Sequence, residues 1–174
     1  MLLVLNKFFE DCRGVAAMEF ALTAPFLALM LLGVAELNNY ITAVRKVSAA
    51  AYTAADLIAQ ETDLTSSELS ELFQASRLVI HPLDDTDLTL GASSVRYDDT
   101  TGDPSVDWTG SYNGGSVSSA TTLATGLGSA GESVIIVTAS YTYTPIYSLI
   151  LSGTLTLSET SITRPRYLDY VGLY

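Results

Sequence analysis

Cysteine and histidine are almost absent from this chain of 174 residues, which has one of each, Cys12 and His81. A single cysteine excludes a disulfide within the chain, so the folded state must be held together by burial alone. A single histidine excludes a multi-histidine metal site, and we interpret His81, which precedes Pro82, as structural. No catalytic constellation is recognisable, so we expect neither an enzyme nor a cofactor.

Basic side chains are also scarce, because eight Lys and Arg residues stand against 19 Asp and Glu residues, for a net charge of −11. Most of the acidic excess lies in residues 61–174, which hold 14 acidic residues and four arginines. Such a surface repels phosphate backbones, which argues against a nucleic-acid partner. The aspartate-rich stretches 84–87 and 98–103 lack the spacing of a helix-loop-helix calcium loop. We interpret them as turns and predict no metal site.

Charge of either sign is nearly missing from residues 15–34, in which Glu19 is the only charged side chain. Twenty helical residues rise about 30 Å, which is the thickness of the hydrocarbon core of a bilayer. We therefore predict a membrane-spanning helix. Pro25 and Gly33 lie inside this run, but bilayer helices tolerate both residues. Residues 1–14 precede the span as a short leader of mixed charge, and the large acidic body favours an N-terminus that stays inside the cell.

The helical pattern continues beyond the predicted span. Apolar residues recur at alternating spacings of three and four, which is the pattern of one helical face. They are Leu37, Tyr40, Val44, Val47, Ala51, Ala54 and Ile58. We predict one continuous helix of roughly 45 residues and about 65 Å. Its outer half needs a partner, either the chain's own β domain or a neighbouring copy, and Leu37, Tyr40, Val44 and Val47 are the candidate packing residues.

Residues 61–174 carry the pattern of a mainly β domain. Thr65 and Ser66 are candidate caps for a second short helix, whose apolar face is Leu69, Leu72 and Phe73 and which ends near Ser76. Short segments of period two follow and are typical of a β meander. They are Leu78 with Ile80, Leu88 with Leu90, Val95 to Tyr97, and Val106 with Trp108.

The C-terminal third holds the two strongest strand patterns, residues 134–143 and 155–162, which we expect to pair antiparallel. Residues 113–130 are predicted to form a loop with one weak helical turn, and residues 145–151 form an apolar patch that covers the core or touches the membrane. The predicted fold class is α+β. A leader (1–14) precedes a transmembrane helix that continues outside the bilayer (15–60), and an extracytoplasmic, mainly antiparallel β domain with a short second helix follows (61–174).

The segment Arg13-Gly14-Val15-Ala16-Ala17-Met18-Glu19-Phe20 is the most informative motif. A carboxylate at the centre of a bilayer costs about 2.5 to 3.5 kcal/mol, and less near the interface. One interpretation is that the Glu19 side chain only extends to the interface of the bilayer and has no further role. The other is that a membrane peptidase cuts after the small residue Gly14, so that the new ammonium group of Val15 neutralises Glu19 of the same or an adjacent subunit.

This motif resembles the processing site of type IV prepilins. Together with Ala21-Leu22, Pro25, Gly33 and Glu36 it is similar to the TadE/TadG family of minor pilins of the tight adherence (Tad, Flp-type) pilus system. The C-terminal part of the chain is also similar to that of the family, in residues 133–137, 141–145 and 163–167.

The resemblance implies a minor pilin or pseudopilin that assembles or primes a pilus and is anchored in the bacterial inner membrane with a periplasmic C-terminal domain. It implies a prepilin peptidase and other pilin and minor pilin subunits as partners. Gly14 would precede the cut and Val15 would become the N-terminus, while Glu19 and Phe20 would be its fifth and sixth residues. Glu19 would set the axial register of the subunit.

A different class of protein is kept as an alternative. Gly33-Val34-Ala35 offers the small residues that signal peptidase reads, which would leave a secreted periplasmic binding module. Against this alternative, the apolar run of 20 residues is longer than the usual signal core of about 7 to 15 residues, and Glu19 lies inside it.

Overall fold

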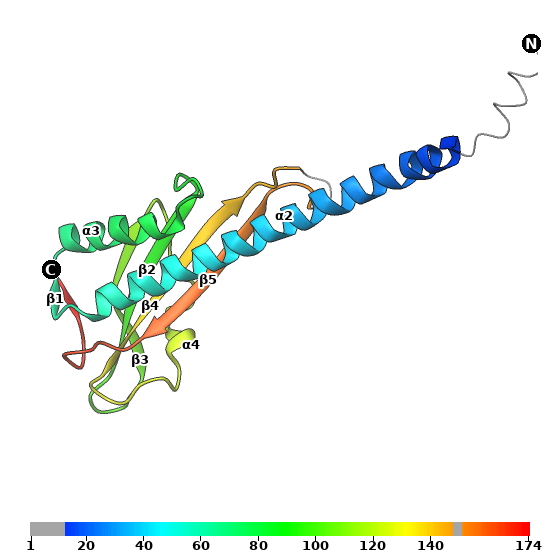
Figure 1. Ribbon diagram of the computed structural model, residues 1–174. Coiled ribbons are helices and arrows are strands. Elements are labelled where there is room, and N and C mark those ends of the chain that lie inside the picture. The colour runs from blue at the N-terminus through cyan, green and yellow to red at the C-terminus, as the bar shows by residue number, and fades with distance from the viewer. Residues whose placement is uncertain (1–12, 148–150) are drawn as a thin grey trace, which may run out of the picture. The chain divides into compact units, whose positions relative to one another are not determined.

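The computed structural model describes residues 13–147 and 151–174. The chain divides into two compact units, the first made of Met1–Asn39 with Pro145–Gly153 and the second of Tyr40–Thr144 with Thr154–Tyr174. One helix, α2 (Arg13–Ala59), begins in the first unit and ends in the second (Figure 1). The predicted single helix is confirmed, and Pro25 lies inside it without ending it.

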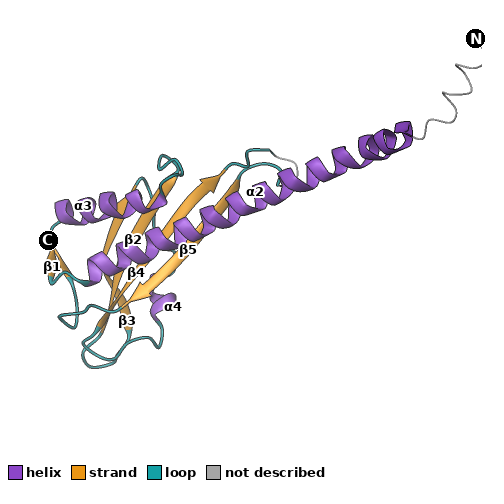
Figure 2. Ribbon diagram, in the orientation of Figure 1, coloured by secondary structure: helices purple, strands orange, loops and turns teal. Residues whose placement is uncertain are grey.

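The second unit is built on a four-stranded antiparallel sheet in the order β3-β2-β4-β5 (Figure 2). The strands are β2 (Leu88–Tyr97), β3 (Pro104–Tyr112), β4 (Ser133–Tyr143) and β5 (Leu155–Thr163). The predicted antiparallel pairing of the two strongest strands, β4 and β5, is confirmed. The segments predicted as a meander that form strands, β2 and β3, pair antiparallel as neighbours, and β4 pairs with β2 on its other side. The largely buried β4 takes a central place, whereas β3, which exposes most of its residues, lies at an edge.

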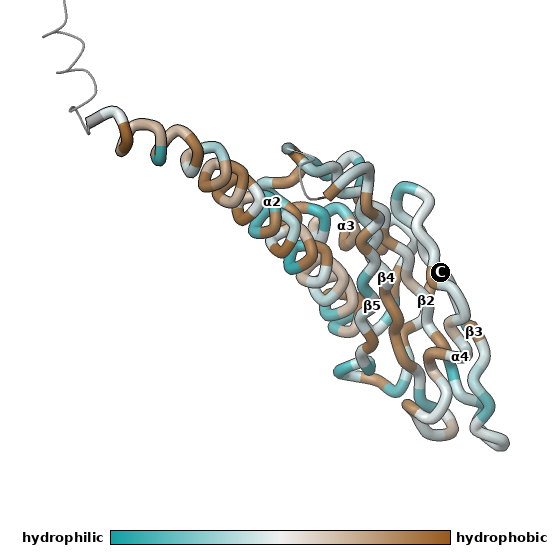
Figure 3. Tube along the Cα trace, turned by 90° about the vertical axis from the view of Figure 1, so that its right-hand side faces the viewer, coloured by the Kyte–Doolittle hydropathy of each residue, from teal (hydrophilic) through white to brown (hydrophobic). Residues whose placement is uncertain are grey.

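The second half of α2 and the helix α3 (Ser66–Arg77) lie on the same face of this sheet (Figure 3). Thr65 caps α3 as predicted, because its hydroxyl accepts from the backbone N–H of Glu68 at 3.3 Å while its own N–H donates to the Glu68 carboxylate at 2.8 Å. Leu69 and Phe73 of α3 pack on Gly110 of β3, where a Cβ atom would lie only 2.4 Å from Leu69. The predicted second helix is therefore confirmed, with its apolar face on the sheet.

Small side chains line the part of α2 that belongs to the second unit. Eight of its residues are at most 1% exposed, and six of the eight are alanines. They are Ala43, Val47, Ala50, Ala51, Ala54, Ala55, Ile58 and Ala59. The C-terminal segment holds the end of this helix, because the backbone N–H of Arg166 donates to the Ala59 carbonyl at 2.9 Å and its guanidinium pairs with Asp56. Alanine keeps the helical backbone close to whatever it packs against.

The opposite face of the sheet is covered by the connection between β3 and β4. Its short helix α4 (Ala120–Ala124) is the predicted helical turn, which is confirmed. A cluster of buried residues joins this helix to the strands, namely Val95, Tyr97, Ala120, Ala124, Val134 and Ile136. The Tyr97 hydroxyl donates to the Ala124 carbonyl across this cluster. The sheet is therefore buried on both faces over its centre.

Three local predictions differ from the structure. Residues 78–80 form a 3-10 turn, η1 (Leu78–Ile80), and not a strand, because Leu78 keeps the helical dihedral angles of the preceding α3. Residues 88–90 and 95–97 belong to one strand, β2, since the small residues between them stay in the ladder. A parallel pair of two-residue strands, β1 (Asp63–Leu64) and β6 (Gly172–Leu173), was not predicted, because two residues are too few for a periodic pattern.

Candidate functional site

The first half of α2 exposes an apolar surface that the fold does not use. Ten of its eleven large hydrophobic side chains between residues 15 and 34 are 54–78% exposed, and the eleventh, Leu32, is half-buried. The ten exposed residues are Val15, Met18, Phe20, Leu22, Phe26, Leu27, Leu29, Met30, Leu31 and Val34. The most apolar 18-residue window of the helix has a mean hydropathy of 2.0 and no buried residue, whereas the core helix of a soluble protein would be mostly buried. This helix is a candidate membrane anchor by length, composition and exposure.

The residues of the predicted processing motif lie in the first two turns of α2. Gly14, Val15, Glu19 and Phe20 are all exposed, and no atom outside the helix lies within 4 Å of the position of a Cβ on Gly14. Val15 and Glu19 are four residues apart and so share one face of the helix. The backbone carbonyl of Glu19 accepts a hydrogen bond from the Thr23 hydroxyl at 3.0 Å. Residues 1–12 of the predicted leader lie outside the described residues.

The four predicted packing residues have different surroundings. Val47 is fully buried within the second unit, so its side chain serves the chain's own fold, and Tyr40 and Val44 are half-buried. Leu37 is 41% exposed and so is open to a partner, as is Ile41 at 48%, which the sequence reasoning missed. From Tyr40 onward the predicted stripe follows the face that is buried in the second unit, whereas Leu37 belongs to an exposed apolar row on a neighbouring face.

That exposed row has its own regular spacing. Its members lie three and four residues apart in alternation, as expected for a seam between two helices, and all are at least 41% exposed. They are Leu27, Met30, Val34, Leu37 and Ile41. We call these five residues the apolar seam. The signal was present in the sequence, but two overlapping heptad-like stripes can be chosen there, and only the observed burial separates them.

Glu36 contrasts with Glu19, the other acidic residue in the first half of α2. Its side chain is fully buried, whereas Glu19 is exposed. Gly33, one turn earlier on the same face, is buried as well. In the sequence Glu36 stood out only as part of the resemblance, because burial of a carboxylate cannot be read from its neighbours in the chain.

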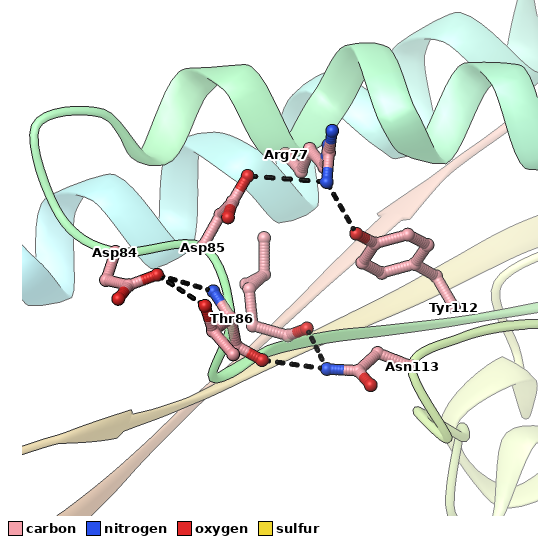
Figure 4. A network of polar contacts seen from close by, with 7 residues as sticks. Arg77, Asp84, Asp85, Thr86, Tyr112 and Asn113 are labelled. Carbon is pink, nitrogen blue, oxygen red and sulfur yellow. Dashed lines mark hydrogen bonds and ion pairs between the residues drawn. The ribbon is translucent and has the colours of Figure 1, made fainter.

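The polar groups around the end of α3 form a structural network (Figure 4). The Arg77 guanidinium donates to the Tyr112 hydroxyl at 3.2 Å and lies 3.5 Å from the Asp85 carboxylate. The Tyr112 hydroxyl raises the pKa of Arg77, and Asp85 adds to this effect. The side-chain amide of Asn113 donates to the carbonyls of Thr86 and Leu88, at 3.0 and 3.1 Å. These contacts tie the α3–β2 connection to the end of β3.

The two aspartate-rich stretches are turns, as predicted. Asp84 accepts from the hydroxyl and backbone N–H of Thr86, and these bonds lower the pKa of Asp84. Asp98 accepts from the backbone N–H groups of Thr100 and Thr101, at 2.8 Å each, which lowers its pKa in the same way. Within residues 13–147 and 151–174, no group of three His, Cys, Asp or Glu side chains is placed to hold a metal ion.

A groove of about 500 Å³ lies beside the last turns of α2, and its lining includes Tyr52, Asp56, Ser161 and Thr163. Its only acidic lining residue, Asp56, is paired with Arg166. Nothing in the groove provides a nucleophile next to a base. The apolar surface of α2 and its first two turns remain the candidate site.

The comparisons with known proteins agree with this location. Residues 14–56 match the model of the TadE-like protein family, and the match covers most of α2. No curated protein and no solved structure gives a significant match to the chain. The matched residues include the whole processing motif from Gly14 onward, the apolar seam and the buried Glu36. The N-terminal helix of this chain is therefore similar to the TadE-like protein family over residues 14–56.

Proposed function

We propose that the chain is a minor pilin-like subunit, or pseudopilin, that takes part in the assembly or priming of a Tad (Flp-type) pilus. The observation that carries this proposal is that the first half of α2 is apolar and exposed, whereas its second half is part of a folded domain. A helix of this kind can leave the bilayer and join a bundle of similar helices without unfolding the domain. The TadE-like match over residues 14–56 supports the same role.

The proposed membrane arrangement is supported by the acidic charge of the second unit. The span from Val15 to Val34 is inserted in the bacterial inner membrane, with the leader in the cytoplasm and the second unit in the periplasm. The 14 acidic residues of positions 61–174 keep that unit soluble. A prepilin peptidase cuts after Gly14, which is accessible on the first turn of α2.

Glu19 acts as the register residue. In a dry bundle of helices an unpaired carboxylate is costly, and pairing with the ammonium group of a processed Val15 removes that cost in one axial alignment only. The apolar seam then packs against helices of neighbouring pilins. Its residues in the outer part, Leu37 and Ile41, extend the contact beyond the bilayer.

Intact-mass measurement of the protein isolated from its host tests the processing step. We expect a mature chain that begins at Val15. A chain beginning at Glu36 would instead support the alternative, a secreted periplasmic binding module, because cleavage after Gly33-Val34-Ala35 removes the apolar half of α2. A chain beginning at Met1 would contradict processing and leave an unprocessed anchor.

The register role is tested with two variants of Glu19. We expect Glu19→Ala and Glu19→Gln to insert into the membrane normally and to reduce piliation to a similar extent, since both remove the charge. Leu22→Ala is the matched control, because Leu22 lies one turn away and is also exposed but carries no charge. Unchanged piliation in both Glu19 variants would refute the role.

A further inference from the structure

The connection between β4 and β5 carries two adjacent exposed hydrophobic residues. Ile146 is 68% exposed and Tyr147 is 45% exposed, whereas the residue before them, Pro145, is buried. Residues 145–153 contain no charged side chain. Adjacent apolar side chains that remain exposed in a folded chain indicate a contact surface. Residues 148–150 of the predicted apolar patch lie outside the described residues, and the following argument uses only Ile146 and Tyr147.

This connection belongs to the same compact unit as the first half of α2, although the strands that it joins belong to the other unit. Among the described helical residues of the first unit, Gly33 and Glu36 are buried, while almost every residue from Gly14 to Leu31 is exposed. The buried residues of the helical part of this unit, Gly33 and Glu36, therefore lie near its outer end and not near the start of the helix.

Gly33 and Glu36 lie at the end of the apolar run of α2. A span that begins at Val15 covers about 30 Å of hydrocarbon by Val34, so Gly33 and Glu36 lie at the outer boundary of the bilayer. Tyrosine is enriched at this boundary, because its ring is apolar and its hydroxyl can reach the headgroups. An exposed isoleucine beside it can enter the adjoining acyl layer.

We propose that Ile146 and Tyr147 form a second membrane contact, in which these two side chains enter the interfacial layer of the leaflet from which α2 emerges. The occupant of this surface is lipid, since the surface belongs to the same compact unit as the exposed apolar half of α2 and its segment lacks charge. The contact rests on the proposed membrane anchoring by α2. It fixes the chain to the bilayer at two points and so limits rotation of the first unit about the helix axis.

The test places a small polarity-sensitive fluorophore at single cysteines in the full chain, in a Cys12→Ser background. The labelled positions are Ile146→Cys and Tyr147→Cys, with Leu29→Cys as the reference for the span. Val106→Cys on β3 is the matched control, because Val106 is 45% exposed, as Tyr147 is. Each protein is reconstituted into vesicles of phosphatidylethanolamine and phosphatidylglycerol, with or without a lipid that carries a nitroxide quencher near its headgroup.

We expect blue-shifted emission and loss of fluorescence to the shallow lipid quencher at positions 146 and 147, and no such loss at position 106. If Leu29 is shielded from aqueous iodide while positions 146 and 147 respond as position 106 does, the lipid contact is overturned and the membrane anchor stands. If Leu29 is also open to iodide, the anchor itself fails. A third outcome would also overturn the lipid contact. If position 146 is shielded from both quenchers, and this shielding disappears when the protein is diluted in lipid, the surface contacts a neighbouring protein.

Discussion

The ring of Tyr40 on α2 meets the ring of Tyr143 at the end of β4 edge to face, with centroids 5.8 Å apart and planes at 73°. Tyr40 is the first residue of the second unit, and Tyr143 lies just before the chain leaves that unit for the β4–β5 connection. The pair therefore joins helix and sheet at the point where both segments pass into the first unit.

Replacing this pair tests how strongly helix and sheet are coupled there. We expect Tyr40→Leu and Tyr143→Leu each to lower the free energy of unfolding, and the double variant to lose less than the sum. A coupling of about 0.5 to 1.5 kcal/mol is typical of an aromatic pair. Denaturant unfolding of the full chain in detergent, followed by the loss of β-sheet signal, measures it. A coupling of zero would mean that the rings touch without stabilising the junction.

The close approach of the β3–β4 connection to β2 gives a prediction at Gly115. A Cβ atom there would lie 2.4 Å from the backbone of Leu90, which cannot move aside without breaking the strand ladder. We expect Gly115→Ala to destabilise the second unit by about 1 to 3 kcal/mol, as overpacking does. Thermal unfolding measures the loss. Ser118→Ala, an exposed position in the same connection, should leave the melting temperature unchanged.

The capping box of α3 predicts a pH dependence. Hydrogen bonds from the backbone and hydroxyl of Thr65 lower the pKa of Glu68 below its ordinary value of 4.5. Because the folded-state pKa is depressed, the stabilisation is fully present above the unfolded pKa and is lost as the pH falls through the folded pKa. Glu68→Gln should therefore reduce the loss of melting temperature on acidification below pH 4.5. The pKa values of Asp84 and Asp98 are also lowered in the folded state, so part of the acid sensitivity of the melting temperature will remain in this variant.

The control for this pH profile is Glu71→Gln, on an exposed position of the same helix. Its acid sensitivity should equal that of the unaltered chain. A Glu68→Gln profile indistinguishable from that of Glu71→Gln would show that the capping box contributes nothing measurable.

The only tryptophan reports on the C-terminal segment. Trp108 is 8% exposed, and its indole N–H donates to the Val171 carbonyl at 2.7 Å. We expect Trp108→Phe to destabilise the fold by about 1 to 3 kcal/mol, because a buried carbonyl loses its donor. Removal of residues 170–174 should shift the tryptophan emission to the red. Unshifted emission would show that other residues keep the indole away from water.

The long elements were predictable from the sequence because each has a strong and unambiguous period. The run from Val15 to Val34 predicted the helix that the structure contains, the capping residues at Thr65 and Glu68 predicted the start of α3, and the β-branched segment 134–143 predicted β4. The strand order was not predictable, because pairing of β4 with β2 depends on which surface is best buried and not on the chain order. The turn at Leu78–Ile80 was misread since two alternating apolar residues fit a strand and a tight helical turn equally well.

The candidate site was chosen from the sequence, and the structure adds to it the burial of each residue. The motif Gly14 to Phe20 could be found from the position of one carboxylate in an apolar run. The apolar seam could not be separated from the buried stripe, since both are apolar rows of the same spacing and differ only in the observed burial of their side chains. The role proposed for Ile146 and Tyr147 could be inferred only from the structure, which groups their connection in one compact unit with the first half of α2.

The buried alanines of α2 give this helix an unusual mutational profile. Truncating an alanine removes only one methyl group, so substitution by a smaller residue creates almost no cavity at Ala50, Ala51, Ala54 or Ala55. Any larger side chain pushes the helix away from its neighbours. Sequence variation along this face should therefore be limited by an upper bound on size, and not by a requirement for hydrophobicity. Glycine and serine are the replacements to expect in natural variants, and leucine or phenylalanine the ones to be missing.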